Sequence, residues 1–372
     1  MKIKIVGCGA AGNKALICAI EKGVIGKEDS LLVNTTIKDV DPAYSDIFMQ
    51  LGNTLKGCGK ERTLAKNITL QHLKAGSDEF DTFINTGDPD MIVFVTSTSG
   101  GSGSGSTTLL AKYVKSVLGK NVHIFGFTGF EADGRELQNT IEFFQDMEED
   151  FGVEALSNNL FLDGFNTIEA EKAANEAFAD KIAVLQGLHI RDSVQNIDDT
   201  DLYKLVTTPR FMVIESVQLP KIRNSKDFES CIKEVLDDSK SLETSVGCHR
   251  LGVIINCRKD ALQYIDTQMN IVRSKYGVPY ESFLHIQHED DMPEFVEIIV
   301  AGMKLPTDEL TAIYDRYKQK SAQVNKEKDS FFDDIGSLRG DPNDSMFNLQ
   351  TQNKKASKND FFGSLDGTIE KY

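Results

Sequence analysis

Short apolar segments alternate with helix-type patterns through the first half of the chain. Residues 2–6 alternate between polar and apolar side chains, which is typical of a strand, and residues 91–95 form a continuous apolar run, as expected of a strand buried on both faces. Further strands are predicted at residues 30–33, 122–127 and 159–162, and helices at residues 14–22 and 107–118. Strands that alternate with helices predict an α/β fold with a Rossmann-like parallel sheet covered on both faces.

A long helix is predicted at residues 167–190. Ala170, Ala174, Phe178 and Leu185 recur at steps of four or seven, so the helix has one apolar stripe. A helix of about 23 residues spans roughly 35 Å, which is the diameter of a small domain. It is therefore long enough to run through the middle of the molecule rather than over one face.

The pattern changes after residue 210 and predicts a second, smaller α+β unit. Its strands are predicted at residues 211–217, 251–257, 283–287 and 295–301, and its helices at residues 226–240 and 259–276. A polar, helix-prone segment follows, and then Asp, Asn, Ser, Lys and Gly dominate, which predicts a disordered tail. The tail contains Phe331-Phe332 and again Phe361-Phe362, either a docking motif or a chance repeat.

These patterns divide the chain into six predicted parts. They are a nucleotide-type α/β domain at 1–166, a central helix at 167–190, a loop and short helix at 191–206, an α+β domain at 207–306, a helix at 307–328 and a flexible acidic and polar tail at 329–372.

Composition and charge exclude several classes of protein. The formal net charge is −16, which repels phosphate backbones and anionic lipid, so direct nucleic-acid binding is not expected. No apolar run is long enough for a transmembrane helix, and the start of the chain is too short in apolar residues for a signal peptide. The 6 cysteines are scattered without any C-x-x-C pair, which favours a reducing cytoplasm over a disulfide framework or a zinc site.

A first glycine motif, G-x-G-x-x-G, is formed by Gly7, Gly9 and Gly12 between a predicted strand and a predicted helix. In that context, bare backbone N–H groups and the positive end of the helix dipole can receive a phosphate. Two alternative interpretations of this motif are a tight strand–helix turn without a ligand and a dinucleotide-binding site. A dinucleotide-binding site needs an acidic residue after the second strand, and this chain has Asn34 and Thr35 there.

A second glycine motif lies at residues 99–106, where glycine and serine alternate between a buried strand and a helix. Such a turn offers clustered backbone donors and hydroxyl groups. A flexible linker has the same composition but does not normally interrupt a strand–helix unit. No G-x-x-x-x-G-K-[ST] motif is present, which argues against a Walker-type nucleotidase. Both motifs together predict one polyphosphate held from two strand ends.

Residues 99–105 resemble the signature of the tubulin/FtsZ superfamily, with Ser102 at the position usually occupied by Thr. The resemblance implies a GTP-binding fold in which residues 52–60 sense the γ-phosphate, and Mg²⁺ is held by phosphate oxygens and water without a protein metal ligand. Thr36 stands where FtsZ-type proteins often carry an acidic residue. The implied nucleotide contacts are Gly9, Ala10, Ala11, Gly12, Asn13, Asn34, Gly100, Gly101, Ser102, Gly103, Ser104, Glu131, Arg135, Asn166 and Asn175. A different count along the central helix makes Asp180 the guanine-reading residue instead of Asn175.

An acidic segment follows the predicted central helix and contains Asn196, Asp198, Asp199 and Asp201. Taken alone, such a segment is typical of a helix N-cap in a solvated turn. The resemblance instead implies the N-x-D-x-x-D catalytic loop of the superfamily, which completes the nucleotide site of the next subunit in a filament. Asp198 and Asp201 would then activate water, with Asn196 as a positioning residue.

The long polar C-terminal region is similar to that of the TubZ branch of this superfamily and lacks the membrane-adaptor peptide pattern associated with FtsZ. This branch implies a head-to-tail filament that segregates plasmid or phage DNA through a small DNA-binding adaptor of the TubR type, so that DNA is reached only indirectly and no membrane is involved. Three alternatives stay open: an FtsZ-type cell-division protein, an NAD-dependent oxidoreductase and a structural filament protein that does not hydrolyse GTP.

Overall fold

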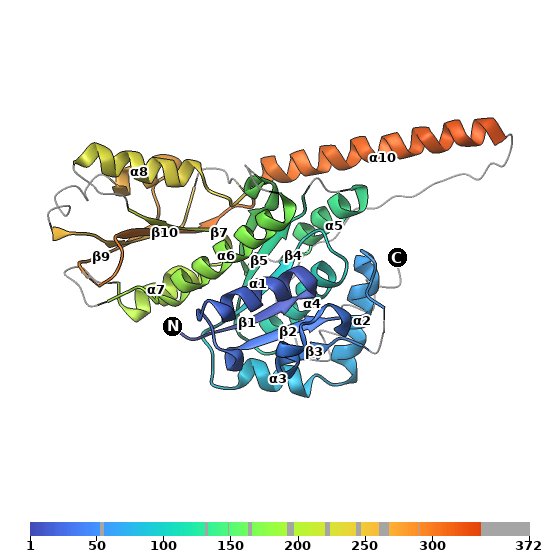
Figure 1. Cartoon of the computed structure of the whole chain (residues 1–372), viewed down its shortest axis with the longest axis horizontal. Coiled ribbons are helices and arrows are strands. Elements are labelled where there is room, and N and C mark those ends of the chain that lie inside the picture. The colour runs from blue at the N-terminus through green and yellow to red at the C-terminus, as the bar shows by residue number, and fades with distance from the viewer. Residues whose placement is uncertain are drawn as a thin grey trace.

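A computed structural model shows an elongated α/β protein in which the N-terminal and C-terminal halves flank the helix α6 (Thr167–Gln186) (Figure 1). The structure describes residues 1–52, 56–130, 133–147, 149–162, 166–191, 197–219, 224–242, 247–259, 268–289 and 291–335, with side chains as far as residue 322. The last helix, α10 (Thr307–Ile335), extends away from the rest of the molecule.

One ten-stranded sheet runs through both halves in the order β3-β2-β1-β4-β5-β6-β7-β10-β8-β9. The strands are β1 (Ile3–Cys8), β2 (Ser30–Asn34), β3 (Phe48–Gln50), β4 (Met91–Ser97), β5 (Asn121–Thr128), β6 (Gly152–Ser157), β7 (Arg210–Gln218), β8 (Arg250–Asn256), β9 (Glu281–Gln287) and β10 (Phe295–Met303). The strands from β3 to β7 are parallel, and β10 is antiparallel to both of its neighbours. The C-terminal unit therefore continues the N-terminal sheet instead of forming a separate one.

Helices cover both faces of the sheet, as the sequence pattern predicts. They are α1 (Gly9–Glu21), α2 (Arg62–Ala75), α3 (Asp78–Asn85), α4 (Ser102–Ser116), α5 (Gly134–Gln145), α7 (Asp199–Val206), α8 (Ser225–Asp237) and α9 (Gln268–Tyr276), together with α6 and α10. Buried residues of α1, α6 and α7 share one hydrophobic cluster, and those of α2, α3, α4, α5, α8 and α9 share the other. None of the helices in the described ranges is both long and apolar enough to cross a membrane.

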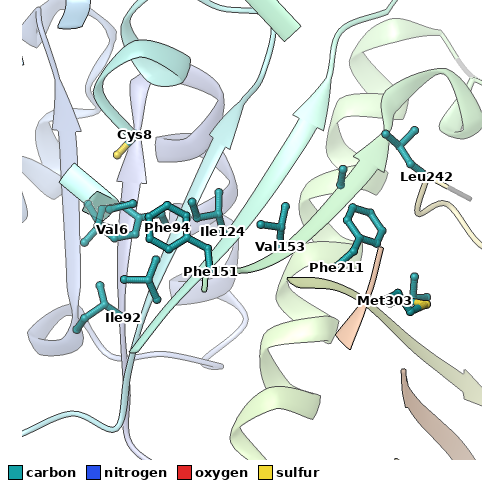
Figure 2. Packing of buried hydrophobic residues seen from close by; sticks show 14 of the residues in the cluster. Val6, Cys8, Ile92, Phe94, Ile124, Phe151, Val153, Phe211, Leu242 and Met303 are labelled. Carbon is teal, nitrogen blue, oxygen red and sulfur yellow. The ribbon is translucent and has the colours of Figure 1, made fainter. Parts of the chain in front are cut away.

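A row of buried side chains crosses the sheet from one half to the other (Figure 2). Phe94, Ile124, Val153 and Phe211 lie in register on four successive strands, and Met303 continues the row on β10. At the junction of the halves, β6 and β7 pair only through Gly152↔Arg210 and Val153↔Phe211. The hydrophobic core is thus continuous across the β6–β7 junction, although only two residue pairs join these strands.

A buried ionic cluster also joins the halves. The Lys181 ammonium group on α6 lies 2.9 Å from Glu154 on β6 and 3.6 Å from Glu215 on β7, and it donates to the backbone carbonyl of Ile214. Ser241 Oγ donates to Glu154 at 2.6 Å. Removing one partner of such a buried pair is costly because the remaining charge has no water to solvate it. The cluster therefore fixes the central helix against the β6–β7 junction.

Several predicted boundaries are wrong. The segment predicted as a strand at residues 159–162 lies in a 3₁₀ turn, Asn158–Phe161, and the strand is β6, in which Glu154 interrupts the apolar run. The helices predicted to start at residues 14 and 107 begin earlier, inside the glycine motifs. The central helix ends at Gln186, where Gly187 has a φ of +67°. Helix α10 includes residues 329–335, which the sequence assigned to the tail, and residues 336–372 lie outside the described part.

His123 on β5 predicts a pH dependence of stability. Its side chain is fully buried, neither ring nitrogen has a hydrogen-bond partner among the described residues, and burial lowers its pKa to about 3. In the unfolded chain His123 takes up a proton below its ordinary pKa of about 6.5, whereas in the folded chain it stays neutral down to about pH 3. The free energy of unfolding is therefore highest above pH 6.5 and decreases as the pH falls towards 3.

We expect His123→Leu to remove this part of the pH dependence of the free energy of unfolding. Between pH 7 and pH 5 the wild type should lose about 2 kcal/mol more unfolding free energy than the variant. Urea unfolding at both pH values measures the difference. Equal losses in the two proteins would contradict a neutral, buried His123.

Candidate nucleotide-binding site

A cavity of about 320 Å³ lies at the carboxyl ends of the central parallel strands, between α1, α5 and α6. The strand order β3-β2-β1-β4-β5-β6 changes direction between β1 and β4, which is the position where open α/β sheets bind ligands. The cavity is lined by Ala11, Lys14, Ser97, Ser99, Phe127, Gly129, Phe130, Glu136, Asn158, Glu171, Ala174 and Asn175.

The two glycine motifs meet directly beside this cavity. Gly9 has a φ of +73°, and a Cβ placed on it would lie 2.8 Å from the backbone nitrogen of Gly103. A Cβ on Gly103 would lie 2.6 Å from the carbonyl oxygen of Cys8 and 2.5 Å from Thr96 Oγ1. Glycine is therefore required at both positions by the approach of one backbone to another. The prediction that the two motifs converge is confirmed by this contact.

The predicted phosphate-contacting residues divide into an accessible and a buried set. Ala10, Ala11, Gly100 and Ser102 are exposed or half-buried, so they are the members of the two motifs that a ligand can reach. The remaining members of the two motifs are buried and shape the turns: Gly9, Gly12, Asn13, Gly101, Gly103 and Ser104. Among them, Asn13 has no hydrogen-bond partner for either polar side-chain atom within the described ranges.

The first turns of α1 and α4 have free hydrogen-bonding capacity. Neither N-cap residue, Cys8 or Gly101, caps its helix through a side chain, and neither first turn contains an acidic residue. By contrast, Asp133 and Asn166 cap α5 and α6 through their side chains. Two uncapped helix N-termini on adjacent parallel strands form an anion-binding arrangement. The Cys8 thiol adds no reactivity, because burial raises its pKa to about 12.

The segment after β2 joins the second glycine motif. Thr35 Oγ1 and Ser102 Oγ share a hydrogen bond of 2.8 Å, and Asn34 Oδ1 accepts from the Thr35 N–H at 2.8 Å. The Cys58 thiol donates to Thr35 Oγ1 at 3.6 Å. The buried side chain of Asn34 thus stabilises the backbone of this segment. Of residues 52–60, predicted to sense the γ-phosphate, positions 53–55 lie outside the described part.

Asn139 is a residue that the sequence reading missed. Its amide donates to the carbonyl oxygens of Lys60 and Ser99 at 3.0 Å and of Gly100 at 3.2 Å. It therefore ties α5 both to the second glycine turn and to the end of segment 52–60. No helix was predicted at residues 134–145, so no sequence signal placed Asn139 near the turn.

Charged groups at the start of α5 also hold that segment. Lys60 lies 2.7 Å from Glu136 and 2.9 Å from Asp133, and its hydrogen bond with Glu136 raises the pKa of the lysine. Arg135, predicted to lie beside the phosphates, pairs with Glu61 at 2.5 Å and does not line the cavity. Glu131, its predicted partner, lies outside the described residues.

The wall formed by α6 distinguishes the candidates for base recognition. Asn175 lines the cavity one turn after Glu171, which pairs with Lys14 across the opening at 3.3 Å. Asp180 instead pairs with Lys22 at 2.8 Å and does not line the cavity. Asn166 accepts two backbone hydrogen bonds as the N-cap of α6. The signal that could have found Glu171 is its spacing of four from Asn175, which places both on one helix face.

Aromatic side chains form another part of the wall. Phe127 and Phe130 line the cavity, while Phe125 is fully buried and packs edge-on against Phe178 at 5.2 Å. Phe125 therefore belongs to the hydrophobic core, whereas Phe127 and Phe130 border the cavity.

The acidic segment lies at the opposite edge of the sheet. Asp198 caps α7 by accepting from the Asp201 N–H at 2.7 Å, as expected of an N-cap. Tyr203 on α7 bonds to Asn121, the first residue of β5, whereas Phe127 near its other end lines the cavity. Six residues of a strand span roughly 20 Å. Asp198 and Asp201 are therefore remote from the cavity of their own chain, and Asn196 lies outside the described part.

Comparisons with known proteins agree with this fold. No protein-family model matches the chain. The tubulin-like protein TubZ of Clostridium botulinum C phage is 23% identical over 375 residues, which cover 97% of this chain and 99% of that protein. The cell division protein FtsZ of Mycoplasmopsis pulmonis is 20% identical over 317 residues, covering 81% and 77%. The GTPγS-bound protofilament of CetZ2 from Haloferax volcanii aligns with a TM-score of 0.73 at 17% identity, covering 87% of this chain and 100% of that one.

The contact between the glycine turns predicts unequal effects of two similar substitutions. Gly103→Ala should push Thr96 and Cys8 away and destabilise the nucleotide-free protein by about 1–3 kcal/mol. Gly100→Ala, in the same turn, should change stability by less than about 0.5 kcal/mol, because nothing lies within 4 Å of its Cβ position. Urea unfolding without nucleotide tests both variants, and equal stabilities would contradict the proposed close approach.

Proposed function

This chain has the tubulin/FtsZ fold and resembles TubZ along nearly its whole length, and we propose that it is a GTPase that assembles head to tail into filaments. One observation carries the proposal. The paired glycine turns lie at one edge of the sheet, and the acidic N-terminus of α7 lies at the other. A subunit that holds a triphosphate at one edge and offers carboxylates at the opposite edge needs a second subunit to bring them together.

The triphosphate would bind at the uncapped N-termini of α1 and α4. Backbone N–H groups at Ala10, Ala11, Gly100 and Ser102 are the accessible donors, and the two helix dipoles favour the negative charge there. Lys14 supplies a nearby positive charge in the cavity wall.

Mg²⁺ would accompany the nucleotide and neutralise charge between its β- and γ-phosphates. Among the described residues, no group of three or more His, Cys, Asp and Glu side chains is arranged to hold a metal ion. The cavity carboxylates Glu136 and Glu171 already pair with Lys60 and Lys14. Phosphate oxygens and water would therefore supply the ligands, which is the usual mode for Mg²⁺.

Hydrolysis would use Asp198 and Asp201 of the adjoining subunit. Carboxylates repel phosphate oxygens but can orient an attacking water and accept its proton. Asn196 is proposed to position that water. Because Asp198 also caps α7, Asp201 is the cleaner residue for a test of catalysis.

A role in plasmid or phage DNA segregation is the biological setting we propose. The similarity to TubZ supports it, and the net charge of −16 requires a basic adaptor between the filament and DNA. The FtsZ-type alternative predicts a membrane anchor as the partner of the C-terminal tail, so affinity capture with the tail separates the two. The similarity to TubZ across both halves of the chain disfavours an NAD-dependent oxidoreductase.

Base recognition predicts a difference between Asn175 and Asp180. Asn175→Leu should weaken GTP binding by about tenfold, as expected for the loss of one hydrogen bond to the base. Asp180→Leu should leave the affinity within about twofold, because Asp180 pairs with Lys22 outside the cavity. Titration of GTP at protein concentrations too low for assembly measures both, and the reverse order would assign the role to Asp180.

Asp201→Ala should retain GTP binding and GTP-dependent light scattering but lose about 100-fold or more in phosphate release. Asp199→Ala is the matched control, since Asp199 is an exposed carboxylate in the same helical turn and should keep the wild-type rate.

The dependence of phosphate release on protein concentration provides a second part of this test. Wild-type phosphate release should begin only above the concentration at which scattering begins. Release by Asp201→Ala at the wild-type rate would overturn the catalytic assignment, and a wild type that assembles without any release would support the structural filament alternative.

A further inference from the structure

Strand β9 buries two polar side chains where an apolar pair would be expected. Its only buried residues are His285 and Gln287, which are 0% and 1% exposed. They are two apart, so they point to the same face of the sheet. This face meets the chain that connects α6 to α7. Burying imidazole and amide groups is unfavourable unless they are hydrogen-bonded, so their partners indicate what they do.

Both residues bond to the backbone of the connection that leads from α6 to Asp198. The Ile197 N–H donates to His285 Nδ1 at 3.2 Å, and the Arg191 N–H donates to Gln287 Oε1 at 2.8 Å. Gln287 Nε2 returns a bond to the carbonyl oxygen of His189 at 2.9 Å. The chain is thus held on β9 both where it leaves α6 and immediately before Asp198, while residues 192–196 lie outside the described part.

These contacts define the state of the His285 ring. A backbone N–H can only donate, so Nδ1 must be the unprotonated acceptor, and Nε2 carries the proton that bonds to Gln287 Oε1 at 2.9 Å. Burial lowers the pKa of His285, which keeps the ring neutral at pH 7. One strand therefore provides a fixed acceptor for Ile197.

The neighbouring strand reinforces the arrangement. Glu297 on β10 and His285 on β9 are in register with the same residue of β8, Ile254. Glu297 is 1% exposed and contacts Nδ1 of His189. The hydrogen bond with Glu297 raises the pKa of His189. The backbone at His189, Arg191 and Ile197 is consequently anchored to a polar row across the sheet.

We propose that His285 and Gln287 are positioning residues for catalysis, which hold Ile197 and Arg191 so that Asp198 and Asp201 face the nucleotide of the next subunit. The inference rests on the proposed function. Ile197 directly precedes the N-cap of α7, so its hydrogen bond fixes where that helix starts. A displacement of about 1 Å at a reacting group can cost about 100-fold in rate, so a small shift of Ile197 would slow hydrolysis.

Two amide substitutions at His285 test the proposal. In His285→Asn, the side-chain oxygen can occupy the place of Nδ1 and still accept from Ile197. In His285→Gln, the oxygen falls near the place of Nε2 and leaves the Ile197 N–H without its acceptor. The two variants bury similar groups, so they differ mainly in where the acceptor lies. Ser282→Ala, at an exposed position of the same strand, is the control.

We expect His285→Asn to keep phosphate release within about threefold of the wild type, and His285→Gln to lose about 10-fold to 100-fold. GTP affinity at low protein concentration should stay unchanged in both, because the cavity lies at the other edge of the sheet. Hydrogen exchange should show the Ile197 amide protected in the wild type and in His285→Asn, and faster exchange in His285→Gln.

Equal rates and equal Ile197 protection in the two variants would overturn the positioning role. A general loss of protection throughout β9 in His285→Gln, with Ile197 no more affected than the rest, would also overturn it in favour of simple destabilisation. A wild type that releases no phosphate would refute the proposed GTPase instead. The Ile197 exchange comparison would then still decide whether β9 holds the start of α7.

Discussion

The adjacent parallel strands β1 and β4 are each followed by a helix that begins within five residues, and α1 and α4 touch there through Gly9 and Gly103. Neither Gly9 nor Gly103 has room for a side chain, because each packs against the backbone of the other turn. This contact keeps two helix N-termini uncapped and close together, and it places the cavity between α1, α5 and α6. Thr35 and Asn139 bond to the second glycine turn, and Lys60, in the segment beside it, pairs with Glu136 on α5.

The sheet separates the two functions that the proposal combines. Its carboxyl edge gathers backbone donors and a lysine, and its amino edge carries α7 with Asp198 and Asp201. The connection from α6 to α7 runs along the C-terminal unit, where His285 and Gln287 hold it. In this proposal the C-terminal unit does more than bury hydrophobic residues, because its strand β9 also orients Asp198 and Asp201.

The sequence predicts well those parts of the fold that depend on local pattern. Strands such as β4 were found because both faces are apolar, and the two glycine motifs were found because their composition is unusual. Strand β6 was missed because Glu154 interrupts it, and partners distant in the sequence, Lys181 and Ser241, make that residue compatible with burial. The first turn of α4 was missed because glycine and serine disfavour helices, whereas burial between neighbouring elements stabilises this one. Asn139 and His285 were not recognised because their roles depend on backbone groups far away in the sequence.

The short pairing between β6 and β7 has a mechanical consequence. Tension applied along the molecule, from one half to the other, would be shared by two register pairs, the row of hydrophobic side chains beneath them and the central helix. Two register pairs join β6 to β7, whereas six join β5 to β6, so we expect the sheet to open first at this junction. The Lys181 cluster lies at that junction and links α6 to β6 and β7, so it shares the tension with the two register pairs and the hydrophobic row.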